Sequence, residues 1–463
     1  MKPLEKRRER TRRERRLDRR RRGDGEKKDA MVIEKRSVPL VELDGGEGEG
    51  GGQILRIAFS TSFLTSRGIS IHSIRKNRST PGFRAQHLAG ANLVRDLCGA
   101  RFTGGEIRST ACTFVPPEGE YPDLPKEIVV DPKTAGAISL IIQIVLPCML
   151  YLSRPLTLRI RGGTDVSFSP PIDYVSNVLL PALFGRKQDT IKLKVERRGF
   201  YPVGGGMVTM SVNHPSRSSL IQPVRMYRQG RVEYVRIFIV VWGSEAEERK
   251  QYAKAIEIAL KEMWSKRYEK DVALLKDVQI IYGVTRKPKR KNKKKSGGTC
   301  FTINIAAYTE TGCVLAHNVT DENRNKSLDK RIEDSCHNKL LKEFERDVIR
   351  SGACCDEHLA DQLLIFMALA RGVSVLRYPE KMSSKHFSTA IDVLKKMIPS
   401  VSFEILDIKS ITASSLTQSL RISDEHAQKD LVNLHRDVLD SVAHCDVDVG
   451  KRTKLLICHG AGR

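Results

Sequence analysis

The chain has 463 residues, of which 40% are hydrophobic, so it is long enough for roughly two to four domains with buried cores. Its 80 Lys and Arg residues against 55 Asp and Glu give a formal net charge of +25, which favours a polyanionic partner or substrate. The ten cysteines are scattered without a C-x-x-C pair, which argues against a disulfide framework or a zinc site and is typical of reduced intracellular thiols.

Residues 1–37 are expected to form a disordered basic tail. Residues 1–30 hold 15 Lys and Arg against 7 Asp and Glu, a composition that cannot build a core. A second basic tract, residues 284–298, holds eight Lys and Arg and no acid. Each tract is either a solvated charge run or a site of nuclear import or non-specific RNA contact. The tail lacks the apolar region of a secretory signal.

Ordered structure is expected from about Ser37, where VPLVEL predicts a strand. A loop with six glycines between Asp44 and Gln53 then leads into QILRIAFSTSFLTSRG, which has helical periodicity. Such a loop before a helix suits an anion such as phosphate. Glu49 would repel a phosphate, and a hard cation such as Mg²⁺ between them removes this conflict.

The first strand–loop–helix unit continues with ISIHSI (69–74), RKNRSTPG and the helical FRAQHLAGANLVRDLCG (83–99). Guanidinium groups bind phosphate oxygens in a bidentate manner, so arginines on a loop that leaves a strand suit a phosphate clamp. Ordinary surface arginines are the alternative. The candidates are Arg56, Arg75, Arg78 and Arg84, with Gln86 a few residues further on.

Residues 134–153 (TAGAISLIIQIVLPCMLYLS) are uncharged and about as long as a membrane-spanning helix. Gln143 and Pro147 interrupt the run, and the chain has no second segment of this kind. We therefore expect a buried helix that ends near Pro147, because proline cannot continue the helical hydrogen bonds.

A second unit follows, with the strand LTLRI (156–160), the loop RGGTDVSFSPP and the helical IDYVSNVLLPALFG. The loop contains Asp165, and RRGFYPVGGGMV (197–208) adds a glycine-rich, hairpin-like turn. Taken alone, both segments are ordinary tight turns.

Residues 219–353 differ in pattern and are expected to form an inserted small α/β domain. They contain a strand at 232–243, an amphipathic helix at 244–264, the strand-like VQIIYGV and CFTINIAAYTETGCVLA, and a charged helical segment at 326–350. The basic tract 284–298 would be a loop of this domain.

A third unit occupies residues 354–411, with a helix at 357–371, a strand at 373–378 and a helix at 386–398. His358, Asp361 and Gln362 lie near the start of the first helix, and His386 begins the second. A helix N-terminus favours a neutral imidazole and an anionic ligand, which suits a histidine nucleophile facing a triphosphate. Residues 412–463 are expected to be an irregular extension with one helical stretch near 424–443.

The repeated pattern predicts an α/β (α+β) fold, in which residues 38–218 and 354–411 form a large domain of three related units. The motifs resemble the RNA 3′-terminal phosphate cyclase family. The matching stretches lie in order along residues 40–406: GEGGGQILR (48–56), SIRKNRSTPGFRAQHL (73–88), TAG with LIIQIVLP (134–147), RGGTD with PPIDY (161–174), RGFYPVGGG (198–206), HLADQ (358–362) and HFST (386–389). The resemblance implies three α/β units, each like the C-terminal domain of a translation initiation factor, and a small inserted domain.

The resemblance also implies an ATP-dependent ligase that converts an RNA 3′-phosphate to a 2′,3′-cyclic phosphate and releases AMP and diphosphate. Its implied nucleophile is His386, which is adenylylated before AMP passes to the RNA. The implied metal ligand is Glu49, with Mg²⁺ or Mn²⁺. The implied nucleotide and phosphate contacts are Arg56, Arg75, Arg78, Gln86, His358, Asp361 and Gln362. His358 stands where the family commonly has an adenine-stacking aromatic, and Ala390 replaces a commonly polar residue.

Two other classes of protein are alternatives. A non-catalytic cyclase-like protein would act in ribosome biogenesis on pre-ribosomal RNA, but such relatives lack the nucleophile and the GEGGGQ loop, which this chain keeps. A basic RNA chaperone would explain the charge but not the ordered motifs. The expected partner is RNA with a 3′-phosphate end and not a membrane, no stable protein partner is indicated, and the expected location is the nucleus (nucleoplasm or nucleolus) or the cytoplasm.

Overall fold

The computed structural model describes residues 39–462, with internal gaps. The gaps are at Glu49, Glu120, Ser153, 187–188, 214–220, 269–273, 285–297, Arg324, 383–384, 421–424 and 444–452. The expected basic tail, most of the basic tract 284–298 and the expected metal ligand Glu49 therefore lie outside the described residues. Residues Leu40–Arg463 form one compact unit.

The first unit places two helices on one face of a four-stranded sheet. Its elements are β1 (Val41–Asp44), α2 (Gln53–Thr65), β2 (Ile69–His72), α3 (Ala85–Cys98), β3 (Arg101–Thr103) and β4 (Cys112–Val115). The sheet has the order β1-β2-β4-β3, with β1 parallel to β2 and the other pairs antiparallel. Burial alternates along β1, β2 and β4, as expected of a sheet with one covered face.

The second unit repeats this arrangement. Its elements are β5 (Glu127–Val130), α4 (Ile138–Tyr151), β6 (Leu156–Gly162), the successive helical segments α5 (Ile172–Tyr174), η1 (Val175–Leu179) and α6 (Leu180–Phe184), β7 (Ile191–Arg197) and β8 (Gly206–Val212). The sheet has the order β5-β6-β8-β7. β5 is parallel to β6, and β8 is antiparallel to both β6 and β7.

The third unit has the same sheet order but is interrupted twice in the sequence. Its elements are β9 (Arg225–Met226), α10 (Glu357–Leu369), β14 (Val373–Pro379), η6 (Glu380–Met382), α11 (Lys385–Met397), β15 (Ser402–Asp407), η7 (Ile408–Ser410), α12 (Ala413–Ser419), α13 (Glu425–Ala443) and β16 (Thr453–His459). The sheet order β9-β14-β16-β15 matches that of the other two units. The mixed α/β fold expected from the sequence is confirmed.

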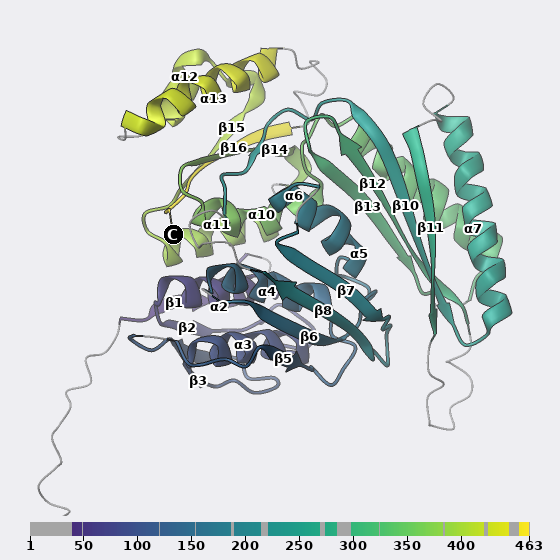
Figure 1. The fold of residues 1–463 in the computed structure, drawn as a ribbon, viewed down its shortest axis with the longest axis horizontal. Helices are drawn as coiled ribbons and strands as arrows, with labels where there is room; N and C mark the ends of the chain where they lie inside the picture. The colour runs from purple at the N-terminus through teal and green to yellow at the C-terminus, as the bar shows by residue number, and fades with distance from the viewer. Residues whose placement is uncertain are drawn as a thin grey trace, which may run out of the picture. The chain divides into compact units, whose positions relative to one another are not determined.

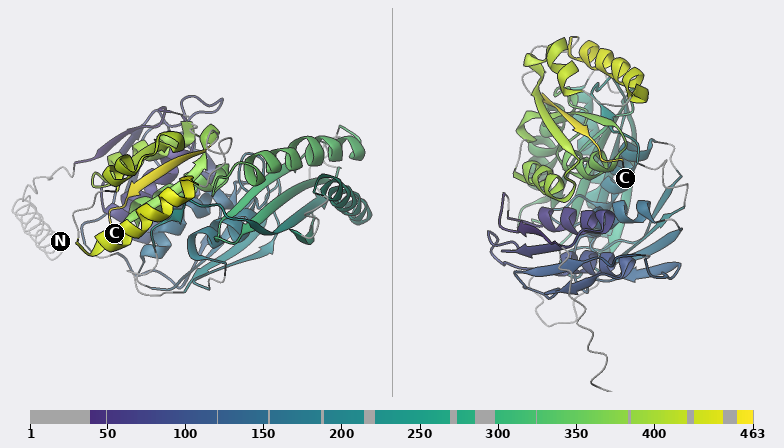
Figure 2. Two further views of the ribbon diagram at one scale, coloured as in Figure 1. Left: turned by 90° about the horizontal axis from the view of Figure 1, so that it is seen from above. Right: turned by 90° about the vertical axis from the view of Figure 1, so that its left-hand side faces the viewer.

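The helices of the three units pack against one another, and the sheets lie outside them (Figures 1 and 2). α2 contacts α3, α4 and α11, while α10 contacts α4 and α11. The first turns of α2, α10 and α11 carry Arg56, His358 and His386. This packing brings together residues that are more than 300 positions apart in the chain.

A further sheet, inserted between β9 and α10, has its own helical cover. Its elements are β10 (Val232–Gly243), α7 (Ala246–Arg267), β11 (Leu275–Val284), β12 (Cys300–Thr309), β13 (Val314–Asp321), α8 (Leu328–Ile332), η4 (Glu333–Leu341), α9 (Lys342–Phe344) and η5 (Glu345–Ile349), and the sheet order is β11-β10-β12-β13. α7 covers one face through a buried stripe that includes Ile256, Leu260 and Trp264 (Figure 1). Phe200 of the second unit stacks on Trp242 of the other face, with ring centroids 4.4 Å apart.

The C-terminal residues differ from the expected extension, because β16 is a central strand of the third sheet. It pairs with both β14 and β15. The helices α12 and α13 separate β15 from β16 in the sequence and cover the outer face of this sheet (Figure 1), so the repeated pattern is not visible along the chain. Similarly, β9 lies within the stretch expected to be the inserted domain but pairs with β14.

The helix α4 also differs from expectation, since it continues through Pro147 to Tyr151. Proline removes one N–H group, and tertiary burial of the surrounding apolar residues keeps the last turn helical. Across the described ranges, no helix is long and apolar enough to cross a membrane.

Candidate active site

Two adjoining hollows hold the described residues that the sequence assigned to catalysis or to nucleotide and phosphate binding. One is an open cleft between loops of the first two units and β13, and the other is a cavity among α2, α4, α10 and α11. Arg56, His358 and His386 line both hollows. The residues brought together are Arg56, Arg75, Arg78, Gln86, His358, Asp361, Gln362 and His386.

His386 lies in the first turn of α11, half-exposed to the cleft. Its burial lowers its pKa, and the positive charges of Arg56 and Arg78 act in the same direction, whereas the Asp361 carboxyl opposes them. His386 is therefore neutral near pH 7, with a nitrogen lone pair available for attack on an electrophile.

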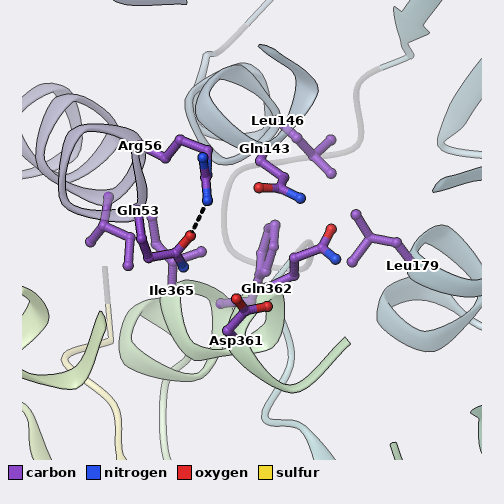
Figure 3. A pocket seen from close by; sticks show the side chains of 10 residues that line it. Gln53, Arg56, Gln143, Leu146, Leu179, Asp361, Gln362 and Ile365 are labelled. Carbon is purple, nitrogen blue, oxygen red and sulfur yellow. Dashed lines mark hydrogen bonds between the residues drawn. The ribbon is translucent and has the colours of Figure 1, made fainter. Parts of the chain in front are cut away.

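Arg56 and Asp361 form an oppositely charged pair of groups beside His386. Arg56 lies one turn into α2 and donates a hydrogen bond to Gln53 Oε1 (Figure 3). Burial lowers the pKa of Arg56 to about 10 and raises the pKa of Asp361 to about 6, while each charge favours the other. Arg56 Nε is buried without a hydrogen-bond partner among the described residues, so this guanidinium has donor capacity left for an anion.

The N-terminus of α10 is held by a buried carboxylate. Asp356 caps this helix by accepting from the N–H groups of His358 at 2.9 Å and Leu359 at 3.1 Å. The same side chain accepts from Tyr174 Oη at 2.6 Å and from Ala316 N at 2.9 Å. Asp356 thus joins the third unit to the second unit and to β13. His358 is exposed, and its ring lies edge-on to Tyr174 at 5.7 Å.

The loop between β2 and α3 carries Arg75, Arg78 and Arg84, which line the cleft. Arg75 has a positive φ of 55° and donates to Thr80 O at 2.7 Å and Gly82 O at 2.9 Å. Arg84 donates to Thr80 Oγ1 at 2.9 Å. Arg78 lines the same cleft. These bonds hold part of the loop in a fixed conformation with its guanidinium groups at the cleft wall.

Gln86 and His87 in the first turn of α3 have different surroundings. Gln86 Oε1 accepts from Ala137 N at 3.0 Å and so holds the N-terminus of α4. Burial lowers the pKa of His87 to about 3, and the charges of Arg56, Arg75 and Arg84 contribute. His87 is therefore a buried, neutral polar group near Arg56, Arg75 and Arg84.

The glycine-rich loop lies against α11. Gly48 has a φ of 59°, and a Cβ atom at this position would lie 1.9 Å from Thr389 Oγ1. At Gly52, a Cβ atom would lie 2.7 Å from His87 Nε2 and 3.0 Å from Arg56 Nη1. Only glycine allows the backbone to approach these side chains so closely. Glu47 forms an exposed ion pair with Lys396 at 3.2 Å.

The described residues contain no group of three or more His, Cys, Asp and Glu side chains that could hold a metal ion by themselves. A magnesium ion is commonly held by one or two carboxylates together with substrate phosphates. The arginine-lined cleft suits a polyphosphate, whose oxygens are themselves magnesium ligands, and the expected carboxylate ligand Glu49 lies outside the described residues.

Sequence reasoning gave no role to two residues that line the cavity, Gln143 and Phe168. Figure 3 shows Gln143 of α4 pointing toward Arg56, Asp361 and Gln362, and these four side chains help to line a further small hollow. The signal in the sequence is an amide within an otherwise apolar run, which fits a polar group facing a cavity. His317, Asn318 and Lys339 of the inserted domain also line the cleft, and no motif marks them.

Comparisons with known proteins match this site region. A family model described as RNA 3′-terminal phosphate cyclase matches residues 47–405. The chain is 33% identical over 379 residues to the probable RNA 3′-terminal phosphate cyclase of Dictyostelium discoideum, which covers 81% of this chain and 80% of that protein. It is 32% identical over 362 residues to the RNA 3′-terminal phosphate cyclase of Drosophila melanogaster, with 77% and 91% covered. Over 174 residues it is 47% identical to that of Thermococcus gammatolerans, with 37% and 48% covered.

Proposed function

Because this chain belongs to the RNA 3′-terminal phosphate cyclase family, we propose that it uses ATP to convert an RNA 3′-phosphate to a 2′,3′-cyclic phosphate. The observation that carries this proposal is the convergence of His386, Asp361 and Arg56 on a cavity that opens into an arginine-lined cleft. A neutral nucleophile beside phosphate-binding cations is the arrangement that nucleotidyl transfer requires.

In the first step, an imidazole nitrogen of His386 attacks the α-phosphorus of ATP. A nitrogen–phosphorus bond forms, the bond to the bridging oxygen breaks, and diphosphate leaves. The imidazole becomes positively charged during the attack, and the nearby Asp361 carboxylate stabilises that charge. Arg56 offers a buried guanidinium for the negative charge on the phosphate.

In the second step, an oxygen of the RNA 3′-phosphate attacks the same phosphorus and displaces the imidazole of His386. The product carries AMP on the RNA 3′-phosphate, which now has a good leaving group. The vicinal 2′-OH then attacks the RNA phosphorus, loses its proton and releases AMP. Arg75, Arg78 and Arg84 line the cleft where the RNA phosphates would lie.

We also propose that Glu49 holds Mg²⁺ or Mn²⁺ together with phosphate oxygens of ATP. A bound divalent cation would neutralise charge on the triphosphate. Glu49 is adjacent to Gly48, whose backbone lies close to Thr389 in the first turns of α11.

The test is labelling of the protein by α-labelled ATP and magnesium. The proposal predicts label that is labile in acid and stable in base, as a phosphoramidate is, and formation of a cyclic phosphate end on a 3′-phosphorylated RNA. His386→Ala should abolish labelling and overall cyclisation, but it should still close an RNA end that is already adenylylated. His337→Ala is the matched control, because His337 is exposed and lies outside both hollows.

Normal labelling of the folded His386→Ala protein would place the nucleophile elsewhere. A wild-type protein that takes no label but still binds RNA would instead favour the non-catalytic class of cyclase-like proteins.

A further inference from the structure

Two aromatic rings are exposed along the wall of the same cleft. Phe168 is fully exposed and Tyr201 is 62% exposed, and both line the cleft together with Arg75, Arg78 and Arg84. Aromatic side chains usually bury most of their surface. Rings that remain accessible beside cationic side chains are the arrangement by which proteins bind single-stranded nucleic acid, since bases stack on the rings and cations meet the phosphates.

Phe168 lies near the middle of a loop whose two ends are joined. Ile172 N donates to Thr164 O at 2.9 Å, and Ser139 Oγ of α4 donates to Pro170 O at 2.6 Å. Phe168 itself has a φ of 63°, a conformation that is unusual and strained for a bulky residue. Such a conformation persists only where the surrounding structure imposes it. The hydrogen bonds at the ends of the loop therefore hold the backbone of Phe168 so that its ring points outward.

A buried ionic network fixes the ends of this loop. Arg198 donates to the two carboxylate oxygens of Asp173 at 2.6 and 2.8 Å and lies 3.4 Å from Asp165 Oδ2. Asp165 is completely buried, and only 10% of the Arg198 side chain is exposed. Because Asp165 and Asp173 lie on either side of Phe168, one guanidinium positions both ends of the segment that carries the ring.

The turn that carries Tyr201 is attached to the same network. Gly199 O accepts from Thr164 N at 2.7 Å and from Asp165 N at 3.3 Å. The next residue, Phe200, stacks on Trp242 of β10. The Tyr201 turn between β7 and β8 is therefore fixed both to the Phe168 loop and to the inserted domain, although Tyr201 itself remains accessible.

We propose that Phe168 and Tyr201 form a stacking platform for the unpaired bases at the 3′ end of the RNA substrate. This inference rests on the proposed function, which makes an RNA 3′ end the substrate of this cleft. Phe168 lines both the cleft and the cavity of His386, whereas Tyr201 lines the cleft, so the two rings suit successive bases that lead away from the reacting phosphate. Every base has a π-face, so the platform favours single-stranded ends without selecting a sequence.

The experiment measures the affinity of the full-length protein, without ATP, for a short fluorescent single-stranded RNA that ends in a 3′-phosphate. Phe168→Ala and Tyr201→Ala should each weaken binding about 5- to 150-fold, the usual effect of losing one stacked base. Phe168→Trp should retain the wild-type affinity. Tyr282→Ala is the matched control, because Tyr282 on β11 is 49% exposed but does not line the cleft, and it should bind RNA as the wild type does.

A second arm uses the same RNA with abasic nucleotides at its 3′ end. If stacking is the interaction, wild type and Phe168→Ala should bind this RNA equally weakly. Equal affinity of Phe168→Ala and wild type for the intact RNA would overturn the platform. An equal loss of affinity for the intact and the abasic RNA in Phe168→Ala would also overturn it. RNA binding is measured without ATP, so this test is independent of labelling by ATP. A protein that takes no label would contradict the proposed function, but its RNA affinity would still test the stacking platform.

Discussion

At the scale of single residues, burial and charge decide the pH at which His386 can react. The pKa of His386 is lowered mainly by burial, so the imidazole is neutral from mildly acidic pH upward. The pKa of Asp361 is raised to about 6, also mainly by burial, so its carboxylate is charged only above that pH. Both required forms coexist above about pH 6.

We therefore predict that RNA-independent labelling by ATP rises as the pH rises from about 5 to about 7 and then levels. Asp361→Asn should lower the labelling rate about 10- to 100-fold, the usual cost of removing a group that orients and supports an active-site ligand. It should also move the acid limb to lower pH, because only His386 still titrates there. Single-turnover labelling across this pH range is the measurement. An unchanged acid limb in Asp361→Asn would show that another group sets it.

The two glutamates of the glycine-rich loop provide a second test at this scale. Glu49→Ala should raise the magnesium concentration needed for labelling, because it removes the carboxylate proposed to hold the metal. Glu47→Ala should change little, since it removes only an exposed ion pair with Lys396, a contact that usually contributes less than about 1 kcal/mol. Magnesium titrations of both variants are the measurement, and identical curves would exclude the metal role of Glu49.

At the scale of elements, the approach of the glycine-rich loop to α11 depends on the absence of a side chain at Gly48. Gly48→Ala should lower labelling about 10- to 100-fold, because a Cβ atom would collide with Thr389 and displace the loop. The double variant Gly48→Ala, Thr389→Ala should recover part of the activity. Gly312→Ala is the control, since Gly312 also has a positive φ but has no atom within 4 Å of the added Cβ. Equal loss in both single variants would point to backbone strain alone.

The strand β16 provides the second test of an element. Leu456 is fully buried in this strand, so Leu456→Ala should lower the free energy of unfolding by about 2–5 kcal/mol. Val432→Ala on α13, where 66% of the side chain is exposed, should change it by less than about 0.5 kcal/mol. Denaturant unfolding measures both. A small effect of Leu456→Ala would mean that β16 does not stabilise the third sheet.

At the scale of the whole molecule, the cleft requires two separately built parts. Ser167 of the second unit donates to Glu322 of the inserted domain at 2.9 Å, and His317 and Lys339 of that domain line the cleft. His317 Nε2 lies 2.8 Å from Glu343 Oε2, and burial lowers the pKa of His317. The inserted domain therefore forms part of the cleft wall against which RNA would lie.

The basic tail belongs to the same scale, because it acts through net charge. Deleting residues 1–36 should leave labelling by ATP intact, since every motif begins later in the chain. It should make the salt dependence of RNA affinity shallower, because fewer phosphates are neutralised. The measurement is RNA affinity at several salt concentrations. We also propose that the tail directs the protein to the nucleus, and the location of a fluorescent fusion with and without residues 1–36 tests this. Lost labelling in a folded deletion variant would contradict this assignment.

Most helices and strands and most candidate residues could be predicted from the sequence, because they follow from local patterns. Helices such as α10 and strands such as β10 agree with periodicity, and eight of the candidate site residues were found from motifs. Local patterns predict wrongly at Pro147, where burial keeps the helix intact, and after β15, where two helices separate neighbouring strands of one sheet.

Which of these residues meet, and what surrounds them, depends on how the three units and the inserted domain pack together. The charges that oppose each other at His386 come from α2, α10 and the loop before α3, and no spacing in the chain encodes their proximity. The same is true of Phe168, which looks like part of an ordinary turn in the sequence. Its exposure and fixed position depend on Arg198, 30 residues later, and on the packing of Phe200 against the inserted sheet. The solvent exposure of each side chain is a property of the assembled fold and not of any single segment. It sets the pKa values in the site and leaves the rings of Phe168 and Tyr201 accessible.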